Sequence, residues 1–322
     1  MEHSLQQIAD RIKRAKRVVI VGHMRPDGDA FGSALALSCA LKKLNISTQV
    51  CVESDIPFNL AFVEGIEKVL KKPTEEYDLF VSVDCSQEQR MGALQEEFLL
   101  AKRKRIDTVN VDHHISNPRY AKYNYVRECS SNCMNVATLI KCLGVALDKQ
   151  IAGYLMLGLL TDSGNFSHDD VNEEGFLLAA ELVKAGADVC YYNYNLFKKQ
   201  SRMRAALFAK VMGGIRYYHE DRFAVAVIEK QMMDAYNADI GMTEGFVDFP
   251  LSIDTVEVAA TLLEVKKGQY KVSLRSKFYA DVNKIAGCYG GGGHIRAAGC
   301  MLFGDVEDIL DRLSYTVSQY LE

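Results

Sequence analysis

The sequence predicts an α/β fold in which an N-terminal parallel-sheet domain is joined by a helical linker to a smaller C-terminal α/β domain. Up to about residue 190, apolar strand-like runs alternate with helix-like segments, the pattern of βαβ units around a parallel sheet. Beyond that point the pattern changes to β-rich stretches, and 322 residues are enough for two domains. We therefore expect domains at residues 1–190 and 215–322, with the linker at 191–214.

The elements of the N-terminal part follow from apolar spacing and from turn residues. Apolar residues at helical spacing predict a short amphipathic helix over residues 4–16. A strand over 17–22 leads into a loop, 23–30, marked by proline and glycine. The helix expected over 32–44 has so little polarity that it should pack against the sheet. The same alternation predicts strands near 47–52, 79–83 and 107–111, and helices near 132–143 and 150–160.

The C-terminal part begins with a segment rich in Lys, Arg, Ala and Leu, which predicts one continuous helix over residues 195–212. Lys266–Gln269 has the composition of a hairpin turn between two of the β-rich stretches that follow. We expect strands near 223–228, 256–265 and 270–274, and helices near 281–288 and 306–320.

Composition excludes several classes of protein. A net charge of −4 and a pI of about 6.0 provide no basic surface for long nucleic acid. We expect no membrane association, because no apolar run approaches the roughly 20 residues that span a bilayer. The N-terminus has no signal-peptide pattern. Nine cysteines without CxxC spacing predict reduced thiols in a cytoplasmic protein.

Acidic residues and histidines follow three of the predicted strands. His23 comes after the first strand, Asp84 after the strand near 79–83, and Asp112-His113-His114 after the strand near 107–111. Because the carboxyl ends of parallel strands share one edge, these groups should lie together. Further acids in the same segments are Asp27, Asp29 and Asp162.

A cluster that contains this many carboxylate and imidazole groups favours a site for two divalent metal ions. Carboxylates suit Mg²⁺ and Mn²⁺, and imidazole shifts the preference toward Mn²⁺. Asp84 stands alone at its strand end and is the expected bridging ligand. His23 and Asp27 can point at one ion and Asp29 at the other. Taken singly, each residue is more typical of a turn, a helix cap or an ordinary histidine, and the joint pattern is what favours metal.

The second strong signal is Gly290-Gly291-Gly292-Gly293-His294. Successive glycines indicate positive φ angles or a close backbone approach, and their amides are expected to form an anion nest. Arg275 stands among neighbouring cations in an otherwise acidic chain and, with His294, is a candidate phosphate or ribose donor. The alternative is a flexible glycine turn with solvated cations. The expected cations are Arg275, Lys277, Lys284 and Arg296.

These motifs together resemble the DHH/DHHA1 phosphoesterases. His23–Ser33 is similar to the family's HxxxDxDxxGS motif, and Asp112–His114 to the motif that gives the family its name. Val83-Asp84 and Thr161–Phe166 resemble two further motifs, and Gly290–Gly299 resembles the GGGHxxAAG motif of the DHHA1 domain. Order and spacing agree over nearly the whole chain.

The resemblance implies a role for each matching residue. His23, Asp27 and Asp84 would hold one Mn²⁺, with Mg²⁺ or Co²⁺ as substitutes. Asp112 would orient its neighbours and His114 would face the scissile phosphate, so these two are the expected catalytic residues. The second ion would be held by Asp29, Asp84, His113 and Asp162. The expected substrate-binding residues are Arg275, Gly291, Gly292, Gly293 and His294.

Length and layout are most similar to the oligoribonuclease/pAp-phosphatase subgroup. That implies hydrolysis of two- to five-nucleotide RNAs to mononucleotides, removal of a phosphate from adenosine 3′,5′-bisphosphate (pAp), or both, by a water activated by two metals. One alternative is a phosphodiesterase for linear or cyclic dinucleotides such as pApA and cyclic di-AMP. A second is a nucleotide-binding protein that retains the fold without catalysis. Paired subunits are common among relatives, so a homodimer is the expected form.

Two segments depart from the family pattern. Ser167–Asp170 stands where relatives often have a basic or aromatic pair, which affects local substrate contacts and not the metals. Ser130–Asn135 lacks an acidic residue that the resemblance leads us to expect.

Overall fold

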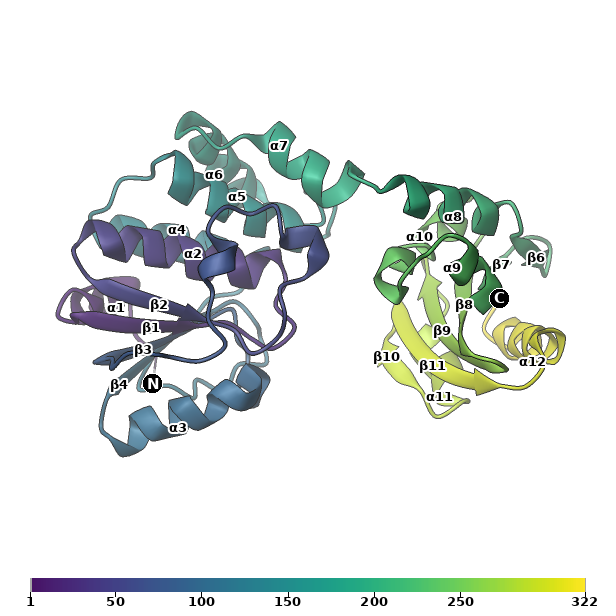
Figure 1. The fold of residues 1–322 in the computed structure, drawn as a ribbon, viewed down its shortest axis with the longest axis horizontal. Helices are drawn as coiled ribbons and strands as arrows, with labels where there is room; N and C mark the ends of the chain where they lie inside the picture. Colours follow the sequence, from purple (N-terminus) through teal and green to yellow (C-terminus); the bar gives the residue numbers. More distant parts are fainter. Residues whose placement is uncertain (1, 322) are drawn as a thin grey trace. The chain divides into compact units, whose positions relative to one another are not determined.

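The computed structural model describes residues 2–321 and divides into two compact units, one ending at Lys199 and the other beginning at Gln200 (Figure 1). Each unit has its own sheet and its own apolar core. The division lies inside the segment expected as the linker. Within the described part of the chain, the helices are too short or too polar to cross a bilayer.

The first unit is built on a five-stranded sheet in which every neighbouring pair is parallel. This confirms the predicted N-terminal parallel sheet. The order across the sheet is β2 (Ser47–Cys51), β1 (Arg17–Val21), β3 (Leu79–Val83), β4 (Asp107–Asp112) and β5 (Tyr123–Val126). Three strands whose ends carry the expected ligands, β1, β3 and β4, are therefore adjacent.

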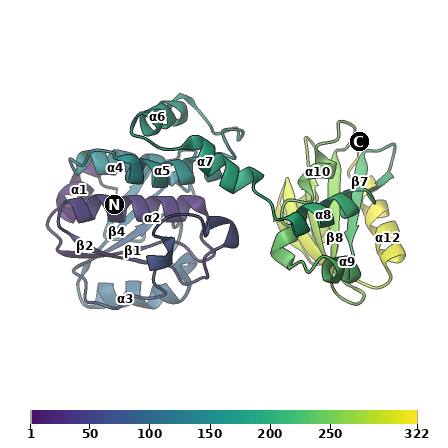
Figure 2. The ribbon, with the colours of Figure 1, turned by 45° about the horizontal axis from the view of Figure 1, so that its top comes forward.

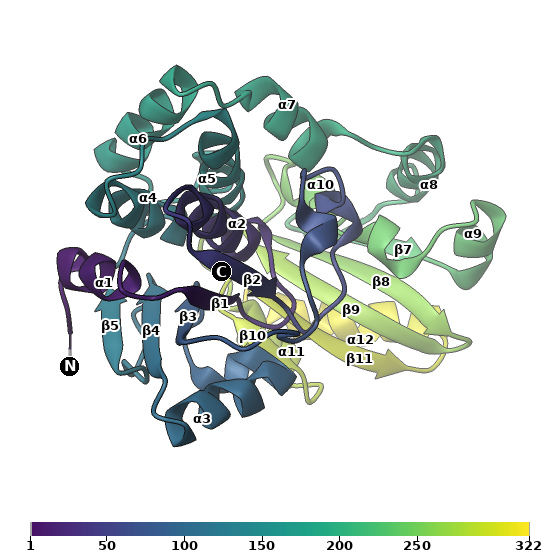
Figure 3. The same cartoon turned by 60° about the vertical axis from the view of Figure 1, so that its left-hand side comes forward.

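The helices of this unit cover both faces of the sheet (Figure 3). They are α1 (Leu5–Ile12), α2 (Gly28–Lys43), α3 (Gln95–Arg103), α4 (Asn132–Cys142), α5 (Lys149–Asp162), α6 (Glu173–Lys184) and α7 (Val189–Asn193), with short 3-10 turns η1 (Phe58–Leu60), η2 (Ile66–Lys68) and η3 (Glu88–Leu94). Val18 and Ile20 of β1 pack with α1, α2, α4 and α5, whereas Val19 and Val21 pack with α3. The alternation follows from the two-residue period of a strand.

Helix α2 begins at Gly28, so the prediction of a loop up to residue 30 is wrong. Asp27 is its N-cap, and the Asp27 carboxylate accepts hydrogen bonds from the backbone N–H groups of Asp29 (3.0 Å) and Ala30 (3.1 Å). An aspartate in this position satisfies amides that have no partner inside the helix. Asp29 consequently lies in the first helical turn and not in a loop.

Glycines allow α2 and α5 to pack with their backbones close together. A Cβ atom at Gly32 would lie 2.5 Å from the carbonyl oxygen of Tyr154. A Cβ atom at Gly158 would lie 2.3 Å from Cys133 Sγ and 2.6 Å from Asp29 Oδ1. This approach brings the last turn of α5 next to the first turn of α2.

The predicted continuous helix over residues 195–212 is wrong. A π-helical turn, η4 (Tyr194–Lys198), ends in extended backbone at Lys199, and α8 (Arg202–Met212) begins afresh. Ser201 caps α8 by accepting a hydrogen bond from the Arg204 N–H (3.0 Å). A serine N-cap in mid-segment is the signal for this break. Leu207 and Val211 of α8 pack in a core of the second unit.

The second unit contains a mixed six-stranded sheet. Its order is β10 (Gly292–His294), β11 (Ala297–Phe303), β9 (Gln269–Ser276), β8 (Val258–Lys266), β7 (Phe223–Ile228) and β6 (Arg216–Tyr218). The pair β7–β8 is parallel and the remaining neighbours are antiparallel. Its helices are α9 (Lys230–Ala235), α10 (Asp248–Leu251), α11 (Val282–Gly287) and α12 (Val306–Ser318), with a 3-10 turn η5 (Ile240–Thr243).

Helices flank this sheet unevenly. Helices α11 and α12 pack against Val272 and Leu274 of β9, and α12 lies along one side of the strands in Figure 2. On the opposite face, α8 and α9 pack on β7 and the end of β8, where they contact Ala226 and Leu263. The alternate residues of β9 on that opposite face, Lys271, Ser273 and Arg275, are more exposed than their buried neighbours.

Candidate active site

The ends of the three adjacent strands bring the expected ligands together. His23 follows β1, Asp84 follows β3, and Asp112 is the last residue of β4. Asp29 comes from α2 and Asp162 from the end of α5. Their side chains form three groups whose ligand atoms lie within 4.8 Å of one another: His23, Asp27 and Asp84; Asp84, His113 and His114; and Asp29, His113 and Asp162.

Asp84 is the centre of this cluster. It is 3% exposed, and each of its carboxylate oxygens faces a different imidazole. Asp84 Oδ2 lies 3.5 Å from His23 Nε2, and Asp84 Oδ1 lies 3.4 Å from His113 Nε2. The backbone of Asp84 has a φ of +50°, a left-handed conformation that costs a non-glycine residue about 1 kcal/mol and is typical of functional sites. The position fits a carboxylate that is shared between two ligand groups.

Backbone carbonyls fix the direction of both imidazoles. His23 Nδ1 lies 2.8 Å from the carbonyl oxygen of Met24, and His113 Nδ1 lies 2.7 Å from that of Cys129. A carbonyl accepts, so Nδ1 carries the proton in each ring. Nε2 is then the ring nitrogen directed at the carboxylates, as in a metal-binding histidine, and it can take up either a proton or a metal ion.

Asp29 is held by the N-terminus of α4. Its carboxylate accepts hydrogen bonds from the Ser131 hydroxyl (2.8 Å) and from the backbone N–H groups of Asn132 (2.5 Å) and Cys133 (3.0 Å). This explains the segment 130–135, which has no acidic residue: its serine and its helix-initial amides orient Asp29. The sequence analysis missed these residues, although Ser131 preceding an apolar helix is an N-cap signal.

Asp162 closes the cluster from the end of α5. Its Oδ2 lies 3.5 Å from His113 Nε2. His168 Nδ1 donates to the backbone carbonyl oxygen of Asp162 at 2.8 Å and so secures the helix end. His168 therefore supports the backbone of a candidate ligand and is not itself a member of the three ligand groups.

The charges of the cluster favour a bound cation. Burial, together with repulsion by Asp84, raises the pKa of Asp29 to about 6. Burial, together with repulsion by Asp29, raises the pKa of Asp162 to about 8. Burial disfavours the charged form of His23, but attraction to its carboxylate neighbours outweighs it and raises the His23 pKa to about 10. Crowded carboxylates beside imidazole nitrogens form a donor set that fits divalent metal ions.

Asp112 and His114 form a second pair beside the cluster. Asp112 is fully buried, and its Oδ1 accepts a hydrogen bond from His114 Nδ1 (2.9 Å). Its Oδ2 accepts from the Asn117 side-chain amide (2.7 Å), and Asn117 is itself held by Asn110 (2.8 Å). The pair therefore fixes His114 with Nε2 away from Asp112. The sequence analysis missed Asn117, whose contacts with Asp112 and Asn110 form only in the folded chain.

The candidate substrate-binding residues lie in the second unit, and Arg275 and His294 share one face of its sheet. Arg275 of β9 is paired with Ala297 of β11, and Ala297 is paired with His294 of β10. Paired residues point to the same face of a sheet, so Arg275 and His294 flank the small Ala297. The next row on the same face is Ser273, Gly299 and Gly292.

The glycine loop has the close backbone approach that the sequence predicted, but not the predicted anion nest. A Cβ atom at Gly291 would lie 2.2 Å from the carbonyl oxygen of Gly299, and Gly293 has a φ of +156°. The expected anion nest is wrong for three amides, because the N–H groups of Gly290, Gly291 and Gly293 donate to protein acceptors. Gly292 lies in an exposed edge strand. The loop thus offers a flat backbone surface.

Most of the neighbouring cations are engaged in protein contacts, contrary to the expected positive patch. Lys277 Nζ donates to the carbonyl oxygen of Ile253 (2.6 Å), and Lys284 pairs with Asp281 (3.4 Å). Arg296 donates to backbone carbonyls of the loop after β9. Lys277 and Arg296 are thus directed at loop carbonyls, whereas Lys284 is 68% exposed and pairs with Asp281 at the surface.

A pocket of about 240 Å³ opens beside Arg275 on the same face of the sheet. Thr261, Ser273 and Lys271 contribute hydroxyls and a second cation, and Glu244 contributes a carboxylate, so the lining carries both signs of charge. The remaining lining residues are Leu263 and the loop residues Ile240, Gly241, Thr243, Glu244, Gly245 and Val247.

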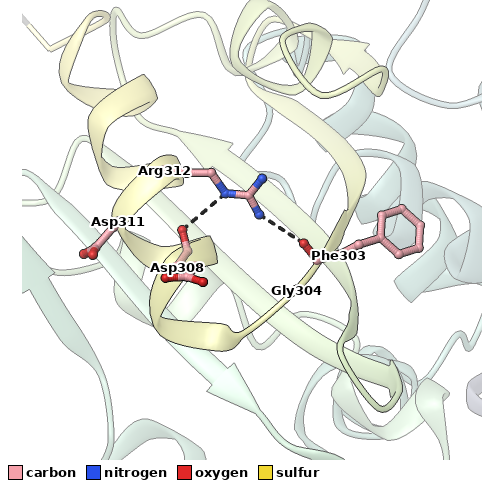
Figure 4. Close-up of a pocket in the computed structure, with 5 residues that line it drawn as sticks. All are labelled: Phe303, Gly304, Asp308, Asp311 and Arg312. Atoms are coloured by element: carbon pink, nitrogen blue, oxygen red, sulfur yellow. Dashed lines mark hydrogen bonds between the residues drawn. The ribbon is translucent and has the colours of Figure 1, made fainter.

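A larger, shallower hollow of about 490 Å³ lies elsewhere in this unit (Figure 4). Arg312 is turned across it and donates to the backbone carbonyl oxygens of Phe303 (3.1 Å) and Asp308 (3.3 Å). The carboxylates of Asp308 and Asp311 also line the hollow. Carboxylates repel phosphate, so this surface does not suit a nucleotide.

Comparisons with known proteins agree with the two units. The model of the DHH family, N-terminal domain, matches residues 17–159, and that of the DHHA1 domain matches residues 220–321. The bifunctional oligoribonuclease and PAP phosphatase NrnA of Thermus thermophilus is 30% identical over 312 residues, which cover 94% of this chain and 90% of that protein.

Two further relatives share the fold or part of the sequence. The crystal structure of an exopolyphosphatase-related protein from Bacteroides fragilis superposes with a TM-score of 0.86 at 26% identity, covering 98% of this chain and 96% of that one. A probable manganese-dependent inorganic pyrophosphatase of Streptococcus mutans is 26% identical over 61% of this chain and 64% of its own length. With both domain models matched in order and a full-length relative at 30% identity, the chain belongs to the DHH family and carries its C-terminal DHHA1 domain.

Proposed function

We propose that this chain is a metal-dependent phosphoesterase that hydrolyses short oligoribonucleotides to mononucleotides and removes a phosphate from pAp. The observation that carries the proposal is the buried Asp84 carboxylate, whose two oxygens each face an imidazole Nε2. The name of the Thermus thermophilus relative supports the choice of substrates. Both activities cleave a phosphate ester, so one site can serve them.

The proposed ligands divide into two sets that share Asp84. His23 and Asp27 belong to the first set, and Asp29, His113 and Asp162 belong to the second. Nitrogen and oxygen donors together favour Mn²⁺ over Mg²⁺, and the manganese-dependent relative is consistent with this choice. When bound, such ions polarise the phosphoryl oxygens and lower the pKa of a coordinated water.

The remaining residues position groups for the substrate. Asp112 accepts the Nδ1 proton of His114, which leaves His114 Nε2 to contact the scissile phosphate or the leaving oxygen. Burial of Asp112 and its bond to Asn117 keep the imidazole in one orientation. In the second unit, Arg275 and His294 would hold the substrate end distant from the cleaved bond.

We further propose a cytoplasmic protein, because all nine cysteines are free thiols. The expected homodimer is a proposal that light scattering of the purified chain tests directly.

The function is tested by phosphate and mononucleotide release from three substrates in parallel, with Mn²⁺ present. The substrates are pAp, a 5′-phosphorylated RNA dinucleotide and cyclic di-AMP. We expect turnover of the first two. Turnover confined to cyclic di-AMP would replace the proposal with second-messenger hydrolysis, and no turnover of any of them would contradict it and favour a binding protein.

A further inference from the structure

An exposed aromatic pair follows β9 in the second unit. Phe278 is 72% exposed and Tyr279 is 44% exposed, although both lie in a short loop that leads directly into α11. Adjacent exposed aromatic residues are unfavourable in water and call for a specific reason. Neither residue was singled out by its sequence pattern, and neither matches a motif that carries the family resemblance.

The backbone of this loop is held by a buried carboxylate. Glu257 is 4% exposed, and its Oε1 accepts hydrogen bonds from three successive N–H groups, those of Phe278 (3.0 Å), Tyr279 (2.7 Å) and Ala280 (2.9 Å). Charge-assisted bonds of this kind are about twice as strong as neutral ones. The buried Glu257 carboxylate therefore fixes the backbone of this loop, while the two aromatic side chains remain exposed to solvent.

An arginine holds the same loop through its carbonyl groups. Arg296 donates to the carbonyl oxygen of Ala280 (2.9 Å) and also to that of Phe278. The Ser276 hydroxyl donates to Ala280 as well, at 2.6 Å. The N–H groups of all three residues and the carbonyl groups of Phe278 and Ala280 are therefore bonded, so the backbone under the rings is held in place and loses little entropy on binding.

The aromatic pair lies at the same end of the sheet as the candidate substrate-binding residues. Arg275, Ala297 and His294 form the last row of paired residues at this end. Beyond the row come the loop after β9 and the β10–β11 turn, and the two are bonded to each other through Val282 N–H and the Ile295 carbonyl oxygen (2.9 Å). Ile295 is also 57% exposed. The exposed side chains next to this row, those of Phe278, Tyr279 and Ile295, are therefore largely apolar.

We propose that Phe278 and Tyr279 form a stacking platform for a nucleobase of the oligonucleotide substrate. This inference rests on the proposed function and names the part of the substrate that the second unit recognises. The amides of Gly290, Gly291 and Gly293 already donate to protein acceptors, whereas rings and backbone planes suit the face of a base. Stacking accepts every base, as an enzyme for mixed short RNAs requires.

The chain contains no tryptophan, which allows a direct binding test. F278W places one indole on the platform, and stacking with a base quenches indole emission. The probe is a diadenosine dinucleotide with a methylenephosphonate linkage, which resists hydrolysis. We expect saturable quenching by this probe and none by ribose 5-phosphate, which has the sugar and the phosphate but no base.

The matched control is F58W, because Phe58 is 94% exposed and belongs to the first unit. Its emission should not change in a saturable manner with either probe. Equal quenching of F278W by ribose 5-phosphate, or no quenching in an F278W enzyme that still hydrolyses a natural dinucleotide, would overturn the platform while leaving the proposed function intact. Failure of wild-type hydrolysis with base-dependent quenching retained would overturn the function instead.

Kinetics of F278A give an independent result. We expect KM for a dinucleotide to rise about tenfold, within the range measured for base–aromatic stacking, with kcat within twofold of wild type. KM for the same dinucleotide lacking its terminal base should not change. An unchanged KM for the complete dinucleotide would contradict the proposal. If light scattering of F278A also showed a change of oligomeric state, the rings would be assigned to a subunit contact instead.

Discussion

At the scale of single residues, the site depends on groups that fix the direction of others. The carbonyl oxygens of Met24 and Cys129 set the tautomers of His23 and His113, and the N-terminus of α4 sets the direction of Asp29. The candidate ligands were predictable because each follows a recognisable strand or helix. Their orienting partners were not, since a backbone carbonyl has no sequence signature.

Asn117→Ala tests one such orienting residue. Loss of its amide removes the hydrogen bond to Asp112 and should lower kcat for a dinucleotide by about 10- to 100-fold with little change in KM. Asn124→Ala is the matched control, since Asn124 of β5 is also buried and its side chain bonds to the backbone of Ala121, just before the strand. We expect the control to reduce stability without this kcat effect. Equal kcat losses in both variants would indicate a purely structural role.

Asp107 provides a test of pH-dependent stability away from the site. Burial disfavours its charge, but Lys122 and Arg11 outweigh burial and lower the Asp107 pKa. A lowered folded-state pKa stabilises the protein above the unfolded value of about 4, and the contribution is lost as the pH falls through the folded pKa. Asp107→Asn should therefore cost about 1 kcal/mol at neutral pH and progressively less below pH ~4, as measured by urea unfolding. A cost that grows toward acid would contradict the assignment.

At the scale of elements, strand order and close helix packing place the ligands. The alternation of apolar and polar runs was enough to predict β1, β3 and β4 and hence the shared edge. It was not enough to predict the start of α2 or the break before α8. The start of α2 and the start of α8 are each set by an N-cap side chain, Asp27 and Ser201. Neither start follows from the spacing of apolar residues in the surrounding sequence. The short strand β10 was missed because glycine has no strand propensity.

Gly158→Ala tests the contact between α5 and α2. The added methyl would meet Cys133 Sγ and Asp29 Oδ1, so we expect a loss of about 1–3 kcal/mol and a displaced Asp29. Gly175 in the first turn of α6 is a matched control, because a Cβ atom there meets no heavy atom within 4 Å. Gly175→Ala should leave stability unchanged or raise it by up to about 1 kcal/mol. Calorimetric unfolding in which the two variants behave alike would show that close packing is not the cause.

At the scale of the whole molecule, the chain consists of two units with separate cores and separate sets of candidate residues. The first unit holds the carboxylate–imidazole cluster and the second holds the Arg275–His294 row and the aromatic pair. The resemblance to the family covered both units and was confirmed. The resemblance did not predict that cations around the glycine loop hold other loops. The hydrogen bonds from Lys277 and Arg296 to backbone carbonyls depend on tertiary structure and have no sequence signal.

The most direct test of the central claim is the rate of mononucleotide release from a 5′-phosphorylated RNA dinucleotide by wild type and Asp84→Asn, with and without Mn²⁺. Asp55→Asn, a substitution at a fully exposed side chain of the same unit, is the control. The account predicts Mn²⁺-dependent turnover in wild type and control, and a loss of at least about 100-fold in Asp84→Asn with the far-ultraviolet dichroism unchanged. Full activity of a folded Asp84→Asn enzyme would contradict it.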